Sequence, residues 1–199
     1  MGYVRGIPYE FAQCHGNRER RPPSEIIEIR GVAYRTIWLT RGQFAVVDVE
    51  SFERLNNLWY YAFYSRTLTG FYAARTVRVD GKNKTVFMHH DVLPAEPGMK
   101  VDHKDGNGLH NWRENLRQAT QRENTWNSGL PSTNTSGFKG VYRHAENDCW
   151  CASIRVEGKT LYLGSRKKEA DAAILYDEAV RKYRGGEFGW LNFKESETI

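Results

Sequence analysis

Apolar and polar positions alternate along much of the first half of the chain, and this period of two predicts β-strands. The predicted strands cover residues 26–29, 44–49, 59–64, 70–79 and 85–88. Asp80-Gly81 lies between the last two strands, and this dipeptide is typical of a two-residue hairpin turn. One interruption, over residues 51–58, has apolar residues at helical spacing and predicts a short helix.

The middle of the chain has another pattern, in which short apolar runs flank a polar segment that contains glycine. Residues 99–103 and 115–119 predict two strands, and residues 104–111 predict the loop between them. Thr120 is followed by Glu123 in the spacing of a capping box, so we expect a helix to begin there. Strand, loop, strand and helix are therefore predicted in close succession.

The last part of the chain follows a linker-like stretch rich in Ser, Thr, Asn and Gly, and it predicts three strands and one long helix. The strands cover residues 138–143, 150–156 and 160–163. The helix follows Gly164-Ser165 and runs to about residue 183, where Gly185-Gly186 ends it. Its apolar stripe, which suits packing on a sheet, consists of Ala172, Ala173, Tyr176, Ala179, Val180 and Tyr183.

These patterns predict an α+β fold in two parts. A β-rich N-terminal region leads into the strand–loop–strand–helix core, and a three-stranded antiparallel sheet packed on one helix follows. The predicted segments are a flexible arm at 1–25, a first domain at 26–127, a linker at 128–137 and a second domain at 138–194.

Composition narrows the functional classes. The 199 residues carry a formal net charge of +5, and the pI of about 9.1 suits a nucleic-acid partner, although many unrelated proteins share it. No apolar run approaches a membrane span, and the N-terminus lacks the apolar core of an export signal. Three cysteines, among them Cys149 and Cys151, favour reduced thiols over a disulfide framework or a metal site. We expect no membrane and no obligate protein partner.

Four polar residues of the middle segment could act together on a phosphodiester. Asp102 and Asn124 offer oxygen ligands that suit one Mg²⁺ or Mn²⁺ ion. His103 has the usual pKa of a general base, and Asn115 could orient its ring or hold the loop. Adjacent residues of a flat strand point to opposite faces, so one shared site requires a bend at His103. If the segment folds otherwise, the same residues form an ordinary polar loop.

A longer motif surrounds these residues. It consists of Met88-His89-His90, residues 101–109, Asn111, residues 113–117, Ala119-Thr120 and Glu123-Asn124. The motif resembles the HNH endonucleases of phage and intron-homing type, which fold their site as a ββα-metal core. The resemblance implies that His103 is the general base and Asn115 a structural asparagine. It also implies that Asp102 and Asn124 are the metal ligands, with one ion per site, so the first domain would be an HNH nuclease domain.

The motif departs from the usual pattern of these nucleases at two places. The family usually has Asp-Asn-Arg where this chain has His110-Asn111-Trp112, and His-Arg where it has His89-His90. Neither departure falls on an inferred ligand, but each removes an arginine that could contact phosphate. We expect His89 and His90 to pack or to support the site, and His110 to lie in the loop.

A second set of anchor residues extends over residues 136–193. It contains Lys139-Gly140-Val141-Tyr142-Arg143, Trp150, residues 152–155, Gly158-Lys159, Tyr162-Leu163-Gly164, Ala172-Ala173, residues 176–179 and Leu191-Asn192-Phe193. The set resembles the AP2 DNA-binding domain, which lays a three-stranded sheet in the major groove of double-stranded DNA. The residues expected on or near the DNA are Lys139, Tyr142, Arg143, His144, Ser153, Arg155, Lys159 and Tyr162. Arg143 could instead contact a phosphate or serve the core.

The two resemblances together imply a metal-dependent DNA endonuclease of the homing or mobile-element type, whose AP2 module supplies site preference. We expect such an enzyme in the cytoplasm of a bacterial or phage-infected cell. Two other functions fit the sequence. One is a non-cleaving, sequence-specific DNA-binding protein with a degenerate HNH domain, and the other is binding of structured RNA, which would be preferred over duplex DNA at matched salt.

Overall fold

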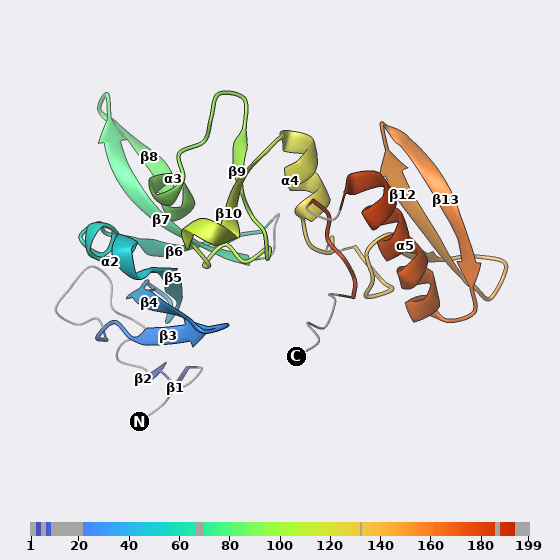
Figure 1. Cartoon of the computed structure of the whole chain (residues 1–199), viewed down its shortest axis with the longest axis horizontal. Coiled ribbons are helices and arrows are strands. Elements are labelled where there is room, and N and C mark those ends of the chain that lie inside the picture. The colour runs from blue at the N-terminus through green and yellow to red at the C-terminus, as the bar shows by residue number, and fades with distance from the viewer. Residues whose placement is uncertain are drawn as a thin grey trace. The chain divides into compact units, whose positions relative to one another are not determined.

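The computed structural model describes residues 3–4, 7–8, 22–66, 70–131, 133–185 and 188–193 (Figure 1). The chain divides into two compact units, Met1–Thr120 and Gln121–Ile199. Strands and helices are mixed within both units, which confirms the predicted α+β class. None of the helices in the described ranges is long and apolar enough to cross a membrane.

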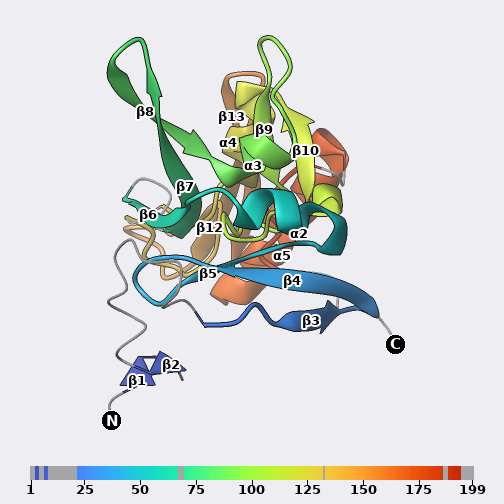
Figure 2. The same ribbon diagram turned by 90° about the vertical axis from the view of Figure 1, so that its left-hand side faces the viewer.

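The first unit consists of small antiparallel sheets and short helices, which Figure 2 shows from a second side. Its elements are β1 (Tyr3–Val4), β2 (Ile7–Pro8), β3 (Ile26–Ile29), β4 (Val32–Trp38), β5 (Phe44–Asp48), α2 (Val49–Asn56), β6 (Tyr61–Ser65), β7 (Gly70–Val79), β8 (Lys82–Phe87), α3 (Met88–Val92), β9 (Lys100–His103), the 3-10 turn η2 (Arg113–Asn115) and β10 (Leu116–Ala119). Strands β3–β4–β5 and β6–β7–β8 form two three-stranded sheets, and β9 pairs with β10. The predicted flexible arm at 1–25 falls mostly outside the described residues.

One apolar core joins the two larger sheets. Helix α2 packs on β4 and β5, helix α3 packs on β7 and β8, and the two helices touch. The buried cluster between them contains Ile37, Leu39, Ala45, Val47, Phe52, Leu55, Tyr60, Ala62, Ala73 and Met88. Each large side chain buried in this way contributes about 1.5–3 kcal/mol. The core therefore fixes β7 and α3, and both of these elements contribute side chains to the candidate site.

A polar clamp also holds α3 against β7. The Asp91 carboxylate accepts hydrogen bonds from Nε and Nη2 of Arg75 at 2.8 and 2.7 Å, and from the Tyr60 hydroxyl at 2.7 Å. Burial acts to raise the pKa of Asp91, but the hydrogen bonds from Arg75 and Tyr60 outweigh it and lower that pKa. The clamp sets the position of the two histidines that precede Asp91.

The second unit is a three-stranded antiparallel sheet covered on one face by a long helix (Figure 1). Its elements are α4 (Gln121–Asn127), β11 (Val141–Arg143), β12 (Trp150–Val156), β13 (Lys159–Arg166) and α5 (Glu169–Arg184). Two buried clusters lie between helix and sheet, and they contain Val141, Ala152, Ile154, Ala172, Ala173, Tyr176, Ala179 and Val180. Small alanines on α5 let the helix approach the strands closely.

Helix α4 belongs to this second unit, although the predicted first domain, 26–127, included it. Trp126 holds it there, because its carbonyl accepts a hydrogen bond from the Trp190 amide at 3.2 Å and its ring lies 5.1 Å from the Arg184 guanidinium. Part of the predicted linker, 128–137, is also built into this unit. The buried Ser136 hydroxyl donates to the Val141 carbonyl at 2.9 Å.

Most predicted elements are present, and strands 70–79 and 150–156 have the predicted bounds. Strand β4 and helix α3 were not predicted. Helix α3 has five residues, too few for a helical period to show in the sequence. The prediction that Tyr183 is part of the buried stripe of α5 is wrong, because its side chain is 40% exposed in the last turn of the helix.

Candidate functional site

The candidate site is built on the β9–β10 hairpin. The register pairs Asp102 with Arg117 and His103 with Leu116, and most of these positions are buried. The ladder stays regular through His103, since the next amide, of Lys104, still donates to the Asn115 carbonyl at 2.8 Å. The chain therefore bends just after His103 and not at His103 itself. The Gly106 amide donates to the His103 carbonyl there, and Gly106 has a φ of +77°. Alternation along β9 directs Asp102 and His103 toward opposite faces.

Asp102 is paired with the arginine opposite it. Its Oδ2 accepts hydrogen bonds from Nε and Nη2 of Arg117 at 2.9 and 2.7 Å, and the two side chains are only 7% and 8% exposed. A buried pair of this kind adds little net stability, but it is costly to break because the remaining charge is left without compensation. Arg117 therefore fixes the orientation of the Asp102 carboxylate.

His103 is buried, and its ring is fixed at one nitrogen. Nε2 lies 3.3 Å from Oδ1 of Asn111, and the amide of Asn111 donates from Nδ2 to the Gly108 carbonyl at 3.3 Å. The second bond orients the amide, so its oxygen faces the ring and Nε2 is the donor. The basic nitrogen is then Nδ1. Burial lowers the pKa of His103, while the bond to Asn111 acts in the opposite direction, and the neutral imidazole is favoured at neutral pH.

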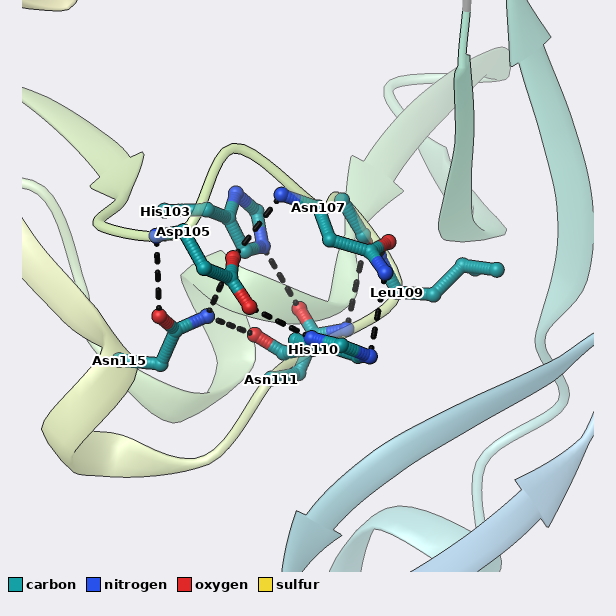
Figure 3. Close-up of polar contacts among 8 residues, drawn as sticks. His103, Asp105, Asn107, Leu109, His110, Asn111 and Asn115 are labelled. Atoms are coloured by element: carbon teal, nitrogen blue, oxygen red, sulfur yellow. Dashed lines mark hydrogen bonds and ion pairs between the residues drawn. The ribbon is translucent and has the colours of Figure 1, made fainter. Parts of the chain in front are cut away.

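The loop after His103 is closed by a network of side chains (Figure 3). Asn115 accepts from the Asp105 amide at 3.2 Å and donates to the Asp105 carboxylate at 3.0 Å and the His110 carbonyl at 2.9 Å. The other carboxylate oxygen of Asp105 lies 2.5 Å from Nδ1 of His110. Asn107 bridges the same residues, with its amide on Asp105 and its side chain on His110. Asn115 therefore acts as a clamp between the two ends of the loop.

The same loop is anchored to the rest of the first unit. Backbone hydrogen bonds join Val46 of β5 to Leu109 at 2.9 Å and to Asn111 at 2.7 Å. On the other side Gly108 lies so close to Tyr72 of β7 that an added Cβ would come within 2.4 Å of the ring. Only glycine fits at that position. The loop, and with it His103, is held between β5 and β7.

Aromatic and histidine rings surround His103. The rings of Tyr72 and His89 lie 5.9 and 5.0 Å from it, both nearly perpendicular to it. His89 stacks on Phe87, and His90 packs against His89. Burial, followed by the neighbouring imidazoles, lowers the pKa of His89 to about 2, so this ring is neutral. Nδ1 of His89 is buried and has no hydrogen-bond partner among the described residues.

The donor set at β9 is compatible with a hard cation. A carboxylate offers about four acceptor positions, and Arg117 uses two of them on Oδ2 of Asp102. Oxygen donors suit Mg²⁺ or Mn²⁺, whereas zinc would require more His or Cys. Over the described ranges, no cluster of three or more His, Cys, Asp or Glu side chains could hold a metal ion. The second predicted ligand, Asn124, is half-buried on α4 in the other unit.

The outer face of the C-terminal sheet presents several of the predicted DNA-contacting residues together. Tyr142 is paired with Cys151, and Ser153 with Tyr162, so these residues share a face with Arg155, opposite to the one that α5 covers. Tyr142 and Tyr162 are 45% and 61% exposed, unusually open for large aromatic side chains. Arg155 is exposed beside them. This face is thus polar and aromatic, with a cation at one end.

The other predicted contacts of this sheet lie elsewhere. Nζ of Lys139 is half-buried and donates to the carbonyls of Trp126 and Ser128, and burial lowers the pKa of Lys139 to about 8. A phosphate would have to displace these carbonyls. Arg143 is exposed and paired with Asp148. The His144 ring accepts two backbone N–H groups of the following turn, and Lys159 is exposed at the start of β13.

Comparison with known proteins identifies the family. Protein 3.8 of Escherichia phage T7 is 37% identical to this chain over 95 residues, which are 48% of the chain and 77% of the phage protein. The chain belongs to the Protein 3.8 family. No protein-family model matches this chain. The name of the T7 protein states no activity, so membership in the Protein 3.8 family leaves the reaction open.

This member of the Protein 3.8 family is also similar to plant proteins over part of its length. An AP2-like ethylene-responsive transcription factor of Arabidopsis thaliana is 36% identical over 86 residues, and an ethylene-responsive transcription factor of the same plant is 46% identical over 56 residues. The aligned parts are 39% and 27% of this chain, but only 25% and 13% of the plant proteins. The predicted AP2 resemblance is thus confirmed as a partial similarity.

Three residues of the site were not assigned by the sequence. Arg117 and Asn111 lie within the predicted motif, and their pairing with Asp102 and His103 depends on strand register and loop closure. No sequence pattern indicates that Tyr72 lies beside His103, because the two residues are 31 positions apart. The apolar strand that contains Tyr72 also predicts a core position for its side chain.

Proposed function

We propose that this chain is a DNA endonuclease of the HNH type, which binds duplex DNA through its C-terminal sheet. The proposal rests above all on His103, a buried neutral imidazole that Asn111 fixes at Nε2 and that is followed by the loop clamped by Asn115. The ring is held in one tautomer by Asn111, and the loop that follows it is closed by Asn115. Both features are expected of a general base.

In the proposed reaction His103 accepts a proton from a water molecule at Nδ1. The water oxygen forms a bond to phosphorus while the bond from phosphorus to the 3′ oxygen breaks, and that oxygen takes a proton from solvent. The HNH resemblance implies products with 5′-phosphate and 3′-hydroxyl ends. Asn115 keeps the loop closed, so that the imidazole stays in one position during the reaction.

Asp102 is the proposed protein ligand of one Mg²⁺ or Mn²⁺ ion in the first unit. When bound, such an ion stabilises the negative charge that develops on the phosphate and on the leaving oxygen. Arg117 orients the Asp102 carboxylate through its two hydrogen bonds. It also reduces the effective charge of that carboxylate, which favours a loosely held ion over a permanently bound one.

The DNA-binding part of the proposal comes from the second unit. The plant relatives are named as transcription factors, and such proteins bind DNA. Tyr142, Ser153, Arg155 and Tyr162 would face the DNA, with Arg155 contributing affinity that falls with salt. A nuclease unit joined to a separate DNA-binding sheet is the organisation of a homing or mobile-element endonuclease.

The decisive experiment is cleavage of supercoiled plasmid by the full chain with Mg²⁺, with Mn²⁺ and with a chelator. Wild-type protein should nick the plasmid only with the metal ion. His103→Ala should reduce cleavage by about 10²- to 10⁴-fold, the usual contribution of a general base, with DNA affinity unchanged. Lys182→Ala, on the exposed side of α5, is the control and should cleave the plasmid at the wild-type rate. No nicking by wild type with either ion would contradict the proposal.

One observation favours a second candidate, a DNA-binding protein that does not cleave. The predicted metal ligand Asp102 is engaged by Arg117, and the arginine usual in the HNH motif is replaced by Trp112. Both features are expected of an HNH domain that no longer binds a metal ion. This candidate predicts metal-independent DNA binding by wild type together with an intact plasmid under all metal conditions.

A further inference from the structure

Among the described residues of the first unit, none packs against the outer half of the β7–β8 hairpin. From Thr76 on β7 to Thr85 on β8, every residue except Val77 is exposed. The hairpin stands out from the unit beyond α3 in both views (Figure 1 and Figure 2). Asp80 and Gly81 close it with φ of 50° and 75°, a two-residue turn that suits the twist of paired strands. The chain therefore maintains a two-stranded ribbon that its own core does not use.

This ribbon is cationic. Arg78, Lys82 and Lys84 are exposed, and within the part of the chain that the structure describes none of their side chains has an ion pair or a hydrogen bond. The nearest acidic residue in sequence, Asp80, lies in the turn. Register places Arg78 opposite Asn83 on one face and the two lysines on the other. Unpaired cations on both sides of a bare ribbon favour a polyanion as its partner.

The ribbon is continuous with the candidate active site. Tyr72 on β7 lies 5.9 Å from the His103 ring, and Phe87 at the base of β8 stacks on His89 at 5.5 Å. Arg78 is six positions beyond Tyr72, which corresponds to about 20 Å along an extended strand. That length equals about six base pairs of duplex DNA at 3.4 Å each. If the scissile phosphodiester of a duplex lies at His103, the base pairs about six positions away lie within reach of the ribbon.

We infer that the outer half of the β7–β8 hairpin is a second DNA-contacting element, which enters the major groove beside the scissile phosphate. The inference rests on the proposed endonuclease function and adds a contact surface to it. A two-stranded ribbon fits the major groove of B-DNA, which is about 12 Å wide, and not the deep, narrow major groove of duplex RNA. Arg78 and Asn83 share one face and carry the side chains that pair best with guanine and adenine edges. Lys82 and Lys84 are then the phosphate contacts.

The test compares two triple variants of the full chain in a chelator, so that binding is measured without cleavage. The first variant carries Arg78→Gln, Lys82→Gln and Lys84→Gln. The matched control carries Arg30→Gln, Arg41→Gln and Arg66→Gln, which removes the same charge from exposed positions of the same unit. The probes are a linear duplex fragment of plasmid DNA and a structured RNA, each titrated at several salt concentrations.

We expect the hairpin variant to bind the duplex more weakly, with a salt dependence of log K that is shallower by up to about three, since each phosphate that the protein neutralises contributes about 0.9 to the slope. The control variant should keep the wild-type slope. Equal slopes for wild type and the hairpin variant, on a duplex that wild type binds, overturn the hairpin inference and leave the proposed function standing. Weakened binding of the RNA alone overturns it as well. If wild type does not bind the duplex, both proposals fail.

Discussion

In the first unit the polar residues of the candidate site are buried against one another, whereas in the second unit they stand on an open sheet face. Asp102, His103 and Asn115 are all buried, and each has a partner inside the unit. Tyr142 and Tyr162 are 45% and 61% exposed, on the sheet face opposite to the one that α5 covers. The buried arrangement of the first unit holds its side chains in one geometry. The exposed sheet face of the second unit leaves its side chains accessible to a binding partner.

The difference follows from the free energy that a polar group loses when it has no hydrogen-bond partner, which is larger for a buried group than for an exposed one. A buried polar group must be fully paired, since an unpaired one loses about 1–3 kcal/mol, so a buried site keeps its side chains in one arrangement. An exposed group loses little when it changes partner, so an open face can exchange water for another molecule. Catalysis depends on the first property, and recognition of a long surface depends on the second.

The largest expected difference in stability between the two units comes from breaking one ion pair in each. Arg117→Met leaves the Asp102 carboxylate buried without a partner and should destabilise the first unit by about 3–5 kcal/mol. Arg143→Met breaks the pair with Asp148, whose side chains are 64% and 90% exposed, and should change stability by less than about 1 kcal/mol. Chemical denaturation, followed by hydrogen exchange in β9, β10 and β11, resolves the two units. Similar losses in both would show that the first unit is not as closed as its burial indicates.

Acid sensitivity should also differ between the units. The pKa of His89 is lowered to about 2, against the ordinary value of 6.5 that it regains on unfolding. Below that ordinary value the unfolded chain binds a proton that the folded chain excludes. Stability is therefore fully present above about pH 6.5 and is lost as pH falls below it, by about 1.4 kcal/mol per pH unit for this ring. The lowered pKa of the His103 ring acts in the same direction.

The variant His89→Gln removes one of the two contributions. The unfolding free energy of the first unit, measured by denaturation between about pH 6 and pH 5, should then depend less steeply on pH, by about 1.4 kcal/mol per unit. His144→Gln, in the second unit, is the control and should leave this slope unchanged. An unaltered slope in His89→Gln would mean that the imidazole takes up its proton in the folded state.

The sequence predicted the elements of the site better than its contacts. Strand, loop, strand and helix follow from short-range patterns, and the hairpin at Asp80-Gly81 follows from turn chemistry. The pairing of Asp102 with Arg117 depends on the register of two strands 15 positions apart, and that register is a property of the folded hairpin. The place of Tyr72 and His89 beside His103 depends on how α3 and β7 pack, which no local pattern encodes. The bend predicted at His103 begins one residue later for the same reason, because the Lys104 amide still pairs with the Asn115 carbonyl.

The smallest expected effect comes from the open face of the second unit. Arg155 is exposed beside Tyr162, and no buried group depends on it, so Arg155→Gln should leave stability within about 0.5 kcal/mol of wild type. If the face binds duplex DNA, the same change should make the salt dependence of log K shallower by about one. Lys182→Gln, on the exposed side of α5, removes an equal charge away from this face and should leave the slope unchanged. Equal slopes for both variants would assign DNA binding to another surface. A loss of stability in Arg155→Gln would mean that this face, like the first site, is held by its own contacts.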